Sequence, residues 1–432
     1  MFGQETLGPR IRDLRVRRGF SQAQLALPEL SDSYVSLIES GKRIPTPSVV
    51  RLLARKLGCS ASYLTSGVSE EMLARLREML QYAHIALQNG EVEEARAKYA
   101  EAVQHPDISA FPELTYEARW GHALALEARG LLDDAVAEFD SLVAGVSPET
   151  DPDRWAWLHI ALCRCHRERG DFGAGVAAGE RGLDRLSGQG KSWTESMVML
   201  GATLLSVFYE RGDLVHARQF AERLIERAEE VSSTTARAAV YWNAGIAAEY
   251  RGELDEALRL VERALALLGE NDDARNLARL REDYGRLLLR ARPDQAQRAH
   301  DILRKAGQEL ADSAAGSVDY AQCLADLARA EIVLGRPKEA VRLATDALKR
   351  LEGDSRLQTA GALIVLGRGH AGLGLRDEAG EVLAQAAEQL EGMRASRHAA
   401  QAWLDLAELL KEAGSEKKSV EAYRHALACA GL

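Results

Sequence analysis

The chain has 432 residues, which is more than one ordinary domain holds, and its 46% hydrophobic and 28% charged residues are normal for a soluble globular protein. Five scattered cysteines exclude a disulfide framework. The longest uncharged run, Ser196–Tyr209, is too short to span a bilayer, and the N-terminus carries no apolar signal core. We therefore expect a cytoplasmic protein with no membrane contact.

The net charge of −10 is divided unevenly along the chain. Residues 1–67 contain ten basic and five acidic side chains, a net charge of +5, which leaves −15 for residues 68–432. A small basic head on a large acidic body indicates that only the head meets a polyanion.

Residues 7–65 are predicted to form five short helices. The first begins near Gly8-Pro9, and Ser21 and Ser31 are expected to cap the second and third. Pro45 and Pro47 open the fourth, and the last begins at Ser60. The turn between the second and third helices contains Pro28-Glu29-Leu30 in place of the usual glycine.

This head resembles the Xre, or lambda-repressor-like, helix-turn-helix family. The resemblance lies in Ser21-Gln22, in Ser33-Tyr34-Val35-Ser36, and in the run Ile38-Glu39-Ser40-Gly41-Lys42-Arg43-Ile44-Pro45. It implies that the start of the third helix enters the major groove of double-stranded DNA.

Docking geometry assigns roles within the head. Side chains at the start of the third helix should face base edges, and flanking polar or basic groups should meet phosphates. Leu37 would contact a thymine methyl and Asp32 would accept from cytosine; alternatively, Leu37 packs and Asp32 only favours the helix dipole. The predicted DNA-binding residues are Gln22, Asp32, Ser33, Ser36, Leu37, Lys42 and Arg43.

The acidic body repeats a helical hairpin about every 40 residues. A loop glycine recurs at positions 90, 130, 170, 212, 252, 335, 374 and 414, and the loop at Arg292-Pro293-Asp294 supplies the missing member. The glycine should end the first helix in a left-handed conformation, and an acid such as Asp171, Asp213 or Glu253 should begin the second. A small residue four or five positions further on lets the two helices approach closely.

The predicted fold is therefore all-α: a five-helix DNA-binding head over residues 1–67 and a right-handed α-solenoid of about nine hairpins over residues 68–432. The hairpins resemble tetratricopeptide repeats (TPRs), whose usual period is about 34 residues. The complete architecture resembles the RRNPP family of peptide-sensing regulators. That resemblance implies a homodimeric transcription regulator whose repeats bind a short signalling peptide in quorum sensing. Two alternatives remain open, a protein-interaction scaffold tethered to DNA and repeats that sequester a phosphorelay protein.

Helical register selects residues of the first helices that should face a ligand groove. Arginines there would bind an acidic group or C-terminal carboxylate, aromatic rings would anchor the ligand, and an amide would pair with its backbone. Alternatively, the arginines form a solvated helix face and the tryptophans pack. The predicted ligand-binding residues are Trp157, Arg164, Arg167, Tyr209, Trp242, Asn243, Arg286, Arg329 and Arg368.

Two other motifs receive structural interpretations. Cys163-Arg164-Cys165-His166 lies within a predicted helix, so its thiols are expected in the core and no metal site is predicted. Four glycines at positions 173, 175, 179 and 182 fall in one helix, which either packs unusually close to its neighbour or is a weak joint. We predict a flexible joint, with faster hydrogen exchange around Gly175 to Gly182 than near Ala257. No catalytic constellation is present in the sequence pattern, so we expect neither an enzyme nor a cofactor.

Overall fold

A computed structural model describes residues 7–188, 192–268, 274–312, 317–351, 355–393 and 396–430. These residues form 23 α-helices and two short 3₁₀ helices, with no strand in the part described. The chain divides into two compact units, Met1–Glu138 and Phe139–Leu432. This division falls inside α9, whereas the boundary expected after residue 67 lies between α5 and α6. The assignment of separate roles to 1–67 and 68–432 therefore stays a prediction.

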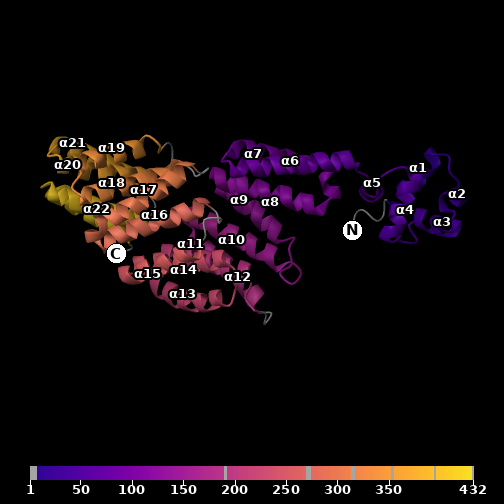
Figure 1. The fold of residues 1–432 in the computed structure, drawn as a ribbon, viewed down its shortest axis with the longest axis horizontal. Helices are drawn as coiled ribbons and strands as arrows, with labels where there is room; N and C mark the ends of the chain where they lie inside the picture. Colours follow the sequence, from indigo (N-terminus) through magenta and orange to yellow (C-terminus); the bar gives the residue numbers. More distant parts are fainter. Residues whose placement is uncertain are drawn as a thin grey trace. The chain divides into compact units, whose positions relative to one another are not determined.

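The head consists of the five expected short helices (Figure 1). They are α1 (Leu7–Arg17), α2 (Gln22–Ala26), α3 (Asp32–Glu39), α4 (Pro47–Leu57) and α5 (Ala61–Ser66). The predicted serine caps are confirmed, because Ser21, Ser31 and Ser60 each accept a hydrogen bond from a backbone N–H in the first turn. Ile11, Leu25 and Leu53 are fully buried in the core that these helices share.

The Lys56 side chain stabilises the end of α2, where the following turn lacks the usual glycine. Its Nζ donates to the carbonyl oxygens of Leu25 and Ala26, each at 3.2 Å, and of Leu27 at 2.5 Å. The Ala26 carbonyl also accepts from the Leu30 backbone N–H at 2.8 Å, and the cation from α4 satisfies the rest of the helix end. The Lys56 ammonium also lies 2.6 Å from Glu29, in the same turn.

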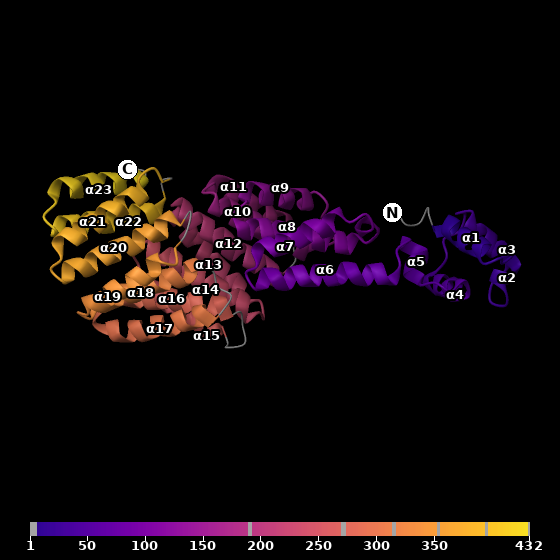
Figure 2. The ribbon, with the colours of Figure 1, turned by 90° about the horizontal axis from the view of Figure 1, so that it is seen from above.

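Eighteen further α-helices form the nine hairpins predicted from the loop spacing. Their bounds are α6 (Glu70–Gln88), α7 (Val92–Gln104), α8 (Pro112–Arg129), α9 (Leu132–Val143), α10 (Pro152–Glu168), α11 (Phe172–Ser187), α12 (Glu195–Arg211), α13 (Leu214–Glu229), α14 (Thr234–Tyr250), α15 (Leu254–Leu267), α16 (Ala274–Ala291), α17 (Ala296–Asp312), α18 (Ser317–Val333), α19 (Pro337–Leu348), α20 (Arg356–Gly372), α21 (Arg376–Leu390), α22 (Arg397–Glu412) and α23 (Glu416–Cys429). Figure 2 shows the last of these, α20 to α23, running side by side.

The loop chemistry follows the prediction with one exception. All eight loop glycines have a positive φ, between 72° and 90°, a conformation that glycine adopts without steric cost. Asp171 and Asp213 accept hydrogen bonds at the start of the second helix, as expected. Glu253 makes no side-chain cap, so the prediction is wrong there; a longer side chain is less suited to this short-range bond. The loop without a glycine forms the 3₁₀ turn Pro293–Gln295.

Close helix contact within a hairpin depends on small residues in both helices. Ala257 and Ala379 are buried at the expected small positions. One turn later, Val261 lies opposite Gly245, where an added Cβ would come within 2.6 Å of the valine side chain. Leu383 covers Gly367 in the same way, at 2.7 Å. Each large side chain thus fits over a position that has none, which allows dense packing.

The glycine-rich helix α11 is closely packed, which supports the first of the two interpretations given for its glycines. A Cβ on Gly179 would lie 2.8 Å from Leu204 Cδ1. One on Gly182 would lie 2.8 Å from both His159 Cγ and Leu200 Cδ2. Gly173, by contrast, is exposed, and a Cβ there would meet only Asp171 Oδ1 at 3.9 Å. The expected core position of the thiols is confirmed, because Cys163 and Cys165 are fully buried.

We predict opposite effects of two alanine substitutions in α11. Gly182→Ala should lower the free energy of unfolding, because overpacking costs about 1–3 kcal/mol and outweighs a gain of about 1 kcal/mol in helix propensity. Gly173→Ala is the matched control and should only gain stability. Thermal unfolding and hydrogen exchange in α11 would measure both. Equal stabilisation by the two substitutions would show that α11 is loosely packed and restore the weak-joint interpretation.

Candidate functional site

The exposed end of α3 carries most of the predicted DNA-binding side chains. Asp32, Ser33 and Ser36 are exposed, and Leu37 retains 41% exposure, so packing alone does not account for it. Asp32 Oδ1 accepts from the Ser33 backbone N–H at 2.8 Å, the local role given as its alternative. Lys42 and Arg43 follow in an exposed loop, and the Arg43 guanidinium lies 5.9 Å from the centre of the Tyr34 ring.

Gln22 is engaged differently from the other members of this set. Its Nε2 donates to Glu39 Oε2 at 2.8 Å, and the same carboxylate receives Arg15 Nε at 2.6 Å and Nη2 at 3.0 Å. Burial alone would raise the pKa of Glu39, but the hydrogen bonds from Arg15 and Gln22 outweigh it and hold that pKa below its ordinary value. Gln22 and Glu39 therefore belong to a buried network that joins α1, α2 and α3. A phosphate contact by Gln22 would have to use what remains of its amide.

We predict that Glu39→Gln destabilises the head by about 3 kcal/mol, because it leaves the Arg15 cation without its buried partner. The pKa of Glu39 is lowered in the folded head, so its contribution is present above the unfolded pKa and is lost as pH falls through the folded pKa. Hydrogen exchange in α1 and α3 of the full chain, at neutral and acidic pH, measures this. Glu29→Gln, at a carboxylate with 47% exposure, is the control and should have a much smaller effect on stability, because solvent screens an exposed ion pair. Equal effects at the two positions would contradict the role given to Glu39.

In the second unit, hydrogen bonds connect the predicted groove residues of successive first helices. Arg167 on α10 donates to Ser206 on α12 at 2.9 Å, and Tyr209 on α12 donates to Asn243 Oδ1 on α14 at 3.2 Å. Trp242 on α14 donates to Asp283 on α16 at 2.8 Å. These contacts form a continuous row of side chains across α10, α12, α14 and α16. Arg167, Tyr209, Trp242 and Asn243 of the predicted ligand-binding set belong to this row.

Asn243 is half-buried in this row. Its Nδ2 donates to the Ala239 carbonyl at 2.9 Å while its Oδ1 accepts from Tyr209. An amide offers two N–H groups and two acceptor lone pairs, so one of each remains for a ligand. Tyr209 is buried and stacks on Tyr250, with ring centres 5.3 Å apart, and burial raises the pKa of its hydroxyl. These contacts set the direction in which the remaining amide groups point.

The remaining predicted residues differ in their surroundings. Trp157 is 39% exposed, Arg164 is half-buried, and Arg368 is exposed. Arg286 and Arg329 are ion-paired, Arg286 with Glu249 at 2.5 Å and Asp283 at 2.9 Å, and Arg329 with Asp326. Acids on neighbouring helices or one turn away thus compensate the charges of Arg286 and Arg329, and their assignment as ligand-binding residues stays a prediction.

Sequence reasoning missed the acids of this face. Glu249, Glu282 and Asp326 are buried on α14, α16 and α18. Burial raises the pKa of Glu282 well above its ordinary value, and repulsion from Asp326 and Asp283 adds to the effect. Burial also opposes ionisation of Glu249, but Arg286 and Arg290 outweigh it and lower its pKa. One signal was available in the sequence: Asp326 stands alone between apolar pairs in Leu324-Ala325-Asp326-Leu327-Ala328.

Known proteins match the two parts of the chain separately. A family model described as a MalT-like TPR region matches residues 79–343, and a helix-turn-helix model matches residues 11–64. The HTH-type transcriptional regulator RamB of Mycobacterium tuberculosis (strain CDC 1551 / Oshkosh) is 39% identical over 74 residues, or 17% of this chain. The chain spans only 16% of the length of that relative. The predicted helix-turn-helix head and TPR-like body are thereby confirmed.

Solved structures share the fold of the repeats. A Rap protein complexed with competence and sporulation factor has a TM-score of 0.56 at 12% identity, covering 83% of this chain and 98% of that one. The Rap conjugation gene regulator of plasmid pLS20, in complex with the Phr* peptide, has a TM-score of 0.52 at 14% identity, covering 83% and 95%. At these identities the likeness shows the fold alone. No helix in the described ranges is long and apolar enough to cross a membrane.

Proposed function

The chain belongs to the MalT-like TPR-region family and carries a helix-turn-helix domain, and from this premise we propose that it is a transcription regulator that binds double-stranded DNA as a homodimer. We propose further that its repeats sense a short peptide. The continuous polar and aromatic row on α10, α12, α14 and α16 carries the second part of this proposal.

The charge and exposure of the head support DNA binding. Its net charge is +5, and the exposed side chains of α3 are followed by the basic pair Lys42-Arg43. In a helix-turn-helix, the start of the third helix reads base edges, whereas flanking cations position the domain on phosphates. We assign Ser33, Ser36, Leu37 and Asp32 to the first role and Lys42 and Arg43 to the second. A dimer would read two half-sites about one helical turn apart.

The shared face of the first helices supports peptide binding. Trp157 and Trp242 would supply aromatic anchors, and the free half of the Asn243 amide would pair with a peptide backbone. Arg167 is hydrogen-bonded to a neutral hydroxyl, so its charge remains for an acidic group of the ligand. Arg286 and Arg329 would instead hold the acids of the groove in position. Structures of the same fold hold competence and sporulation factor or the Phr* peptide, which agrees with this use of the repeats.

DNA binding is tested by comparing Arg43→Ala with Ser33→Ala. Loss of a phosphate contact should weaken binding to every sequence and reduce the slope of log affinity against log salt by about 1. Loss of a base contact should instead relax preference at one position, by about 1–3 kcal/mol. Selection of binding sites followed by fluorescence anisotropy at several salt concentrations separates the two. Arg223→Ala, on the exposed surface of α13, is the control; identical behaviour of Arg43→Ala and Ser33→Ala would contradict the assignment.

Peptide sensing is tested by calorimetry with synthetic peptides encoded beside the gene. Asn243→Ala should weaken binding by about 1–3 kcal/mol, because it leaves ligand groups without partners and releases Tyr209. Tyr209→Phe removes only the hydroxyl and should have a smaller effect. Gln219→Ala, at an exposed amide on α13, should leave affinity unchanged. If a peptide binds with the same affinity to all three variants, the groove is placed wrongly.

A further inference from the structure

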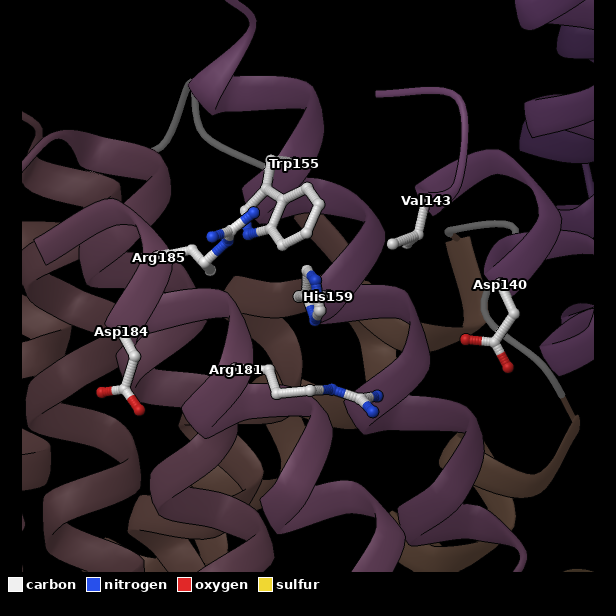
Figure 3. A pocket seen from close by; sticks show the side chains of 7 residues that line it. All are labelled: Asp140, Val143, Trp155, His159, Arg181, Asp184 and Arg185. Atoms are coloured by element: carbon white, nitrogen blue, oxygen red, sulfur yellow. The ribbon is translucent and has the colours of Figure 1, made fainter. Parts of the chain in front are cut away.

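A cavity of about 510 Å³ lies between α9, α10 and α11 and is formed wholly by the second compact unit (Figure 3). Its lining combines apolar and charged side chains. Val143 and Trp155 give the apolar surface, Asp140 stands on α9, and Arg181 and Arg185 stand on α11. The proposed DNA-binding and peptide-binding surfaces use none of these residues.

The cavity is separate from the groove of the first helices. Trp155 and Trp157 are two positions apart on α10, so their side chains point to different faces of that helix. Trp157 is part of the proposed peptide groove. Trp155 is directed to α11, where its Nε1 donates to the Gly182 carbonyl at 3.3 Å. The absence of a side chain at Gly182 makes room for His159, because a Cβ there would lie 2.8 Å from His159 Cγ.

Charges of opposite sign stand on different helices around the cavity. Arg181 and Arg185 are one helical turn apart on α11, both are exposed, and neither forms an ion pair or hydrogen bond with any residue that the structure describes. In Figure 3 Arg181 extends past His159 toward Asp140, whereas Asp184 points away from them. Asp140 is exposed on α9, and its carboxylate also has no partner among the described residues. The cavity thus offers cations from α11 and an anion from α9.

His159 also lines the cavity, with a neutral ring. Its Nδ1 lies 2.7 Å from the Ala178 carbonyl, and a carbonyl can only accept, so Nδ1 carries the proton. Burial lowers the pKa of His159 to about 4, which keeps the ring neutral at pH 7. Nε2 is then a buried acceptor, and it has no partner among the described residues. Because neighbouring protein atoms cover Nε2, it is not a contact for a ligand, and His159 contributes a neutral ring to the cavity wall.

We propose that this cavity binds a free α-amino acid with an apolar side chain. The carboxylate would meet the Arg181 guanidinium group, which suits it in geometry and charge. The ammonium would meet the exposed carboxylate of Asp140. The side chain would pack against Trp155 and Val143. A zwitterion fits because the two charges of the ligand match charges held on different helices, and neither a simple acid nor a simple amine satisfies both.

The test is calorimetry on the full chain with each apolar L-amino acid at millimolar concentration. For L-leucine, the matched probes are 4-methylpentanoate, which lacks the ammonium, and 3-methylbutylamine, which lacks the carboxylate. We expect at least one amino acid to bind, and its two matched probes to bind at least tenfold more weakly. Absence of binding by every apolar amino acid would overturn the proposal. So would equal binding of the acid alone, which would make this a plain anion site.

Variants at the exposed charges locate the site without disturbing the core. Arg181→Gln and Asp140→Asn should each weaken amino-acid binding at least tenfold. Arg223→Gln on α13 and Glu180→Gln, an exposed acid on α11 outside the cavity lining, are the matched controls and should leave it unchanged. Undiminished binding in Arg181→Gln and Asp140→Asn would show that the amino acid binds elsewhere. Because the head and the peptide groove are intact in all four variants, DNA and peptide binding provide an independent check of folding.

Discussion

Close approach of two helices at one small residue per hairpin is the constraint on which the rest of this structure depends. A single hairpin of this length cannot bury its apolar face, so stability comes from stacking hairpins into a continuous core. Buried alanine at positions such as 257 and 379, and glycine opposite the next large side chain, bring the backbones together. In α11 the same requirement is met by Gly179 and Gly182, at the cost of helix propensity. The close contact there also brings Trp155 and His159 to the wall of the cavity.

The first helices of successive hairpins share one face of the stack, and several charged groups on that face are paired with one another. Arg286 is held between Glu249 and Asp283, and Arg329 is held by Asp326. Removing one partner of such a buried pair leaves an uncompensated charge, which costs several kcal/mol. The groove therefore has a fixed arrangement of donors and acceptors rather than an excess of one charge. Under the proposed function, such a surface would select a ligand by hydrogen-bond geometry, and Asn243 and Arg167 retain groups with which it could do so.

In the head, too, charged and polar side chains from different helices are paired with one another. Glu39 accepts hydrogen bonds from Arg15 on α1 and Gln22 on α2, and Lys56 on α4 donates to the carbonyls at the end of α2. The Glu39 network and the Lys56 ammonium both give hydrogen-bond partners to polar atoms inside the head, which would otherwise depend on water. Their effect is to hold α3 at a defined angle while its outer face stays exposed.

The sequence alone determined the helices, the hairpin count and the loop conformations, because these depend on local chemistry. Serine caps, positive-φ glycines and the 40-residue period act within one or two turns of the chain, and all are found as expected. Only the tertiary structure decided which charges face each other. Arg286 and Glu249 are 37 positions apart, and Arg15 and Glu39 are 24 apart, so helical register could place each side chain on a face but could not name its partner. The cavity beside His159 also depends on the tertiary structure, because three helices form it. The role of Gly182 there could not be predicted from the sequence, because it depends on the contact with His159.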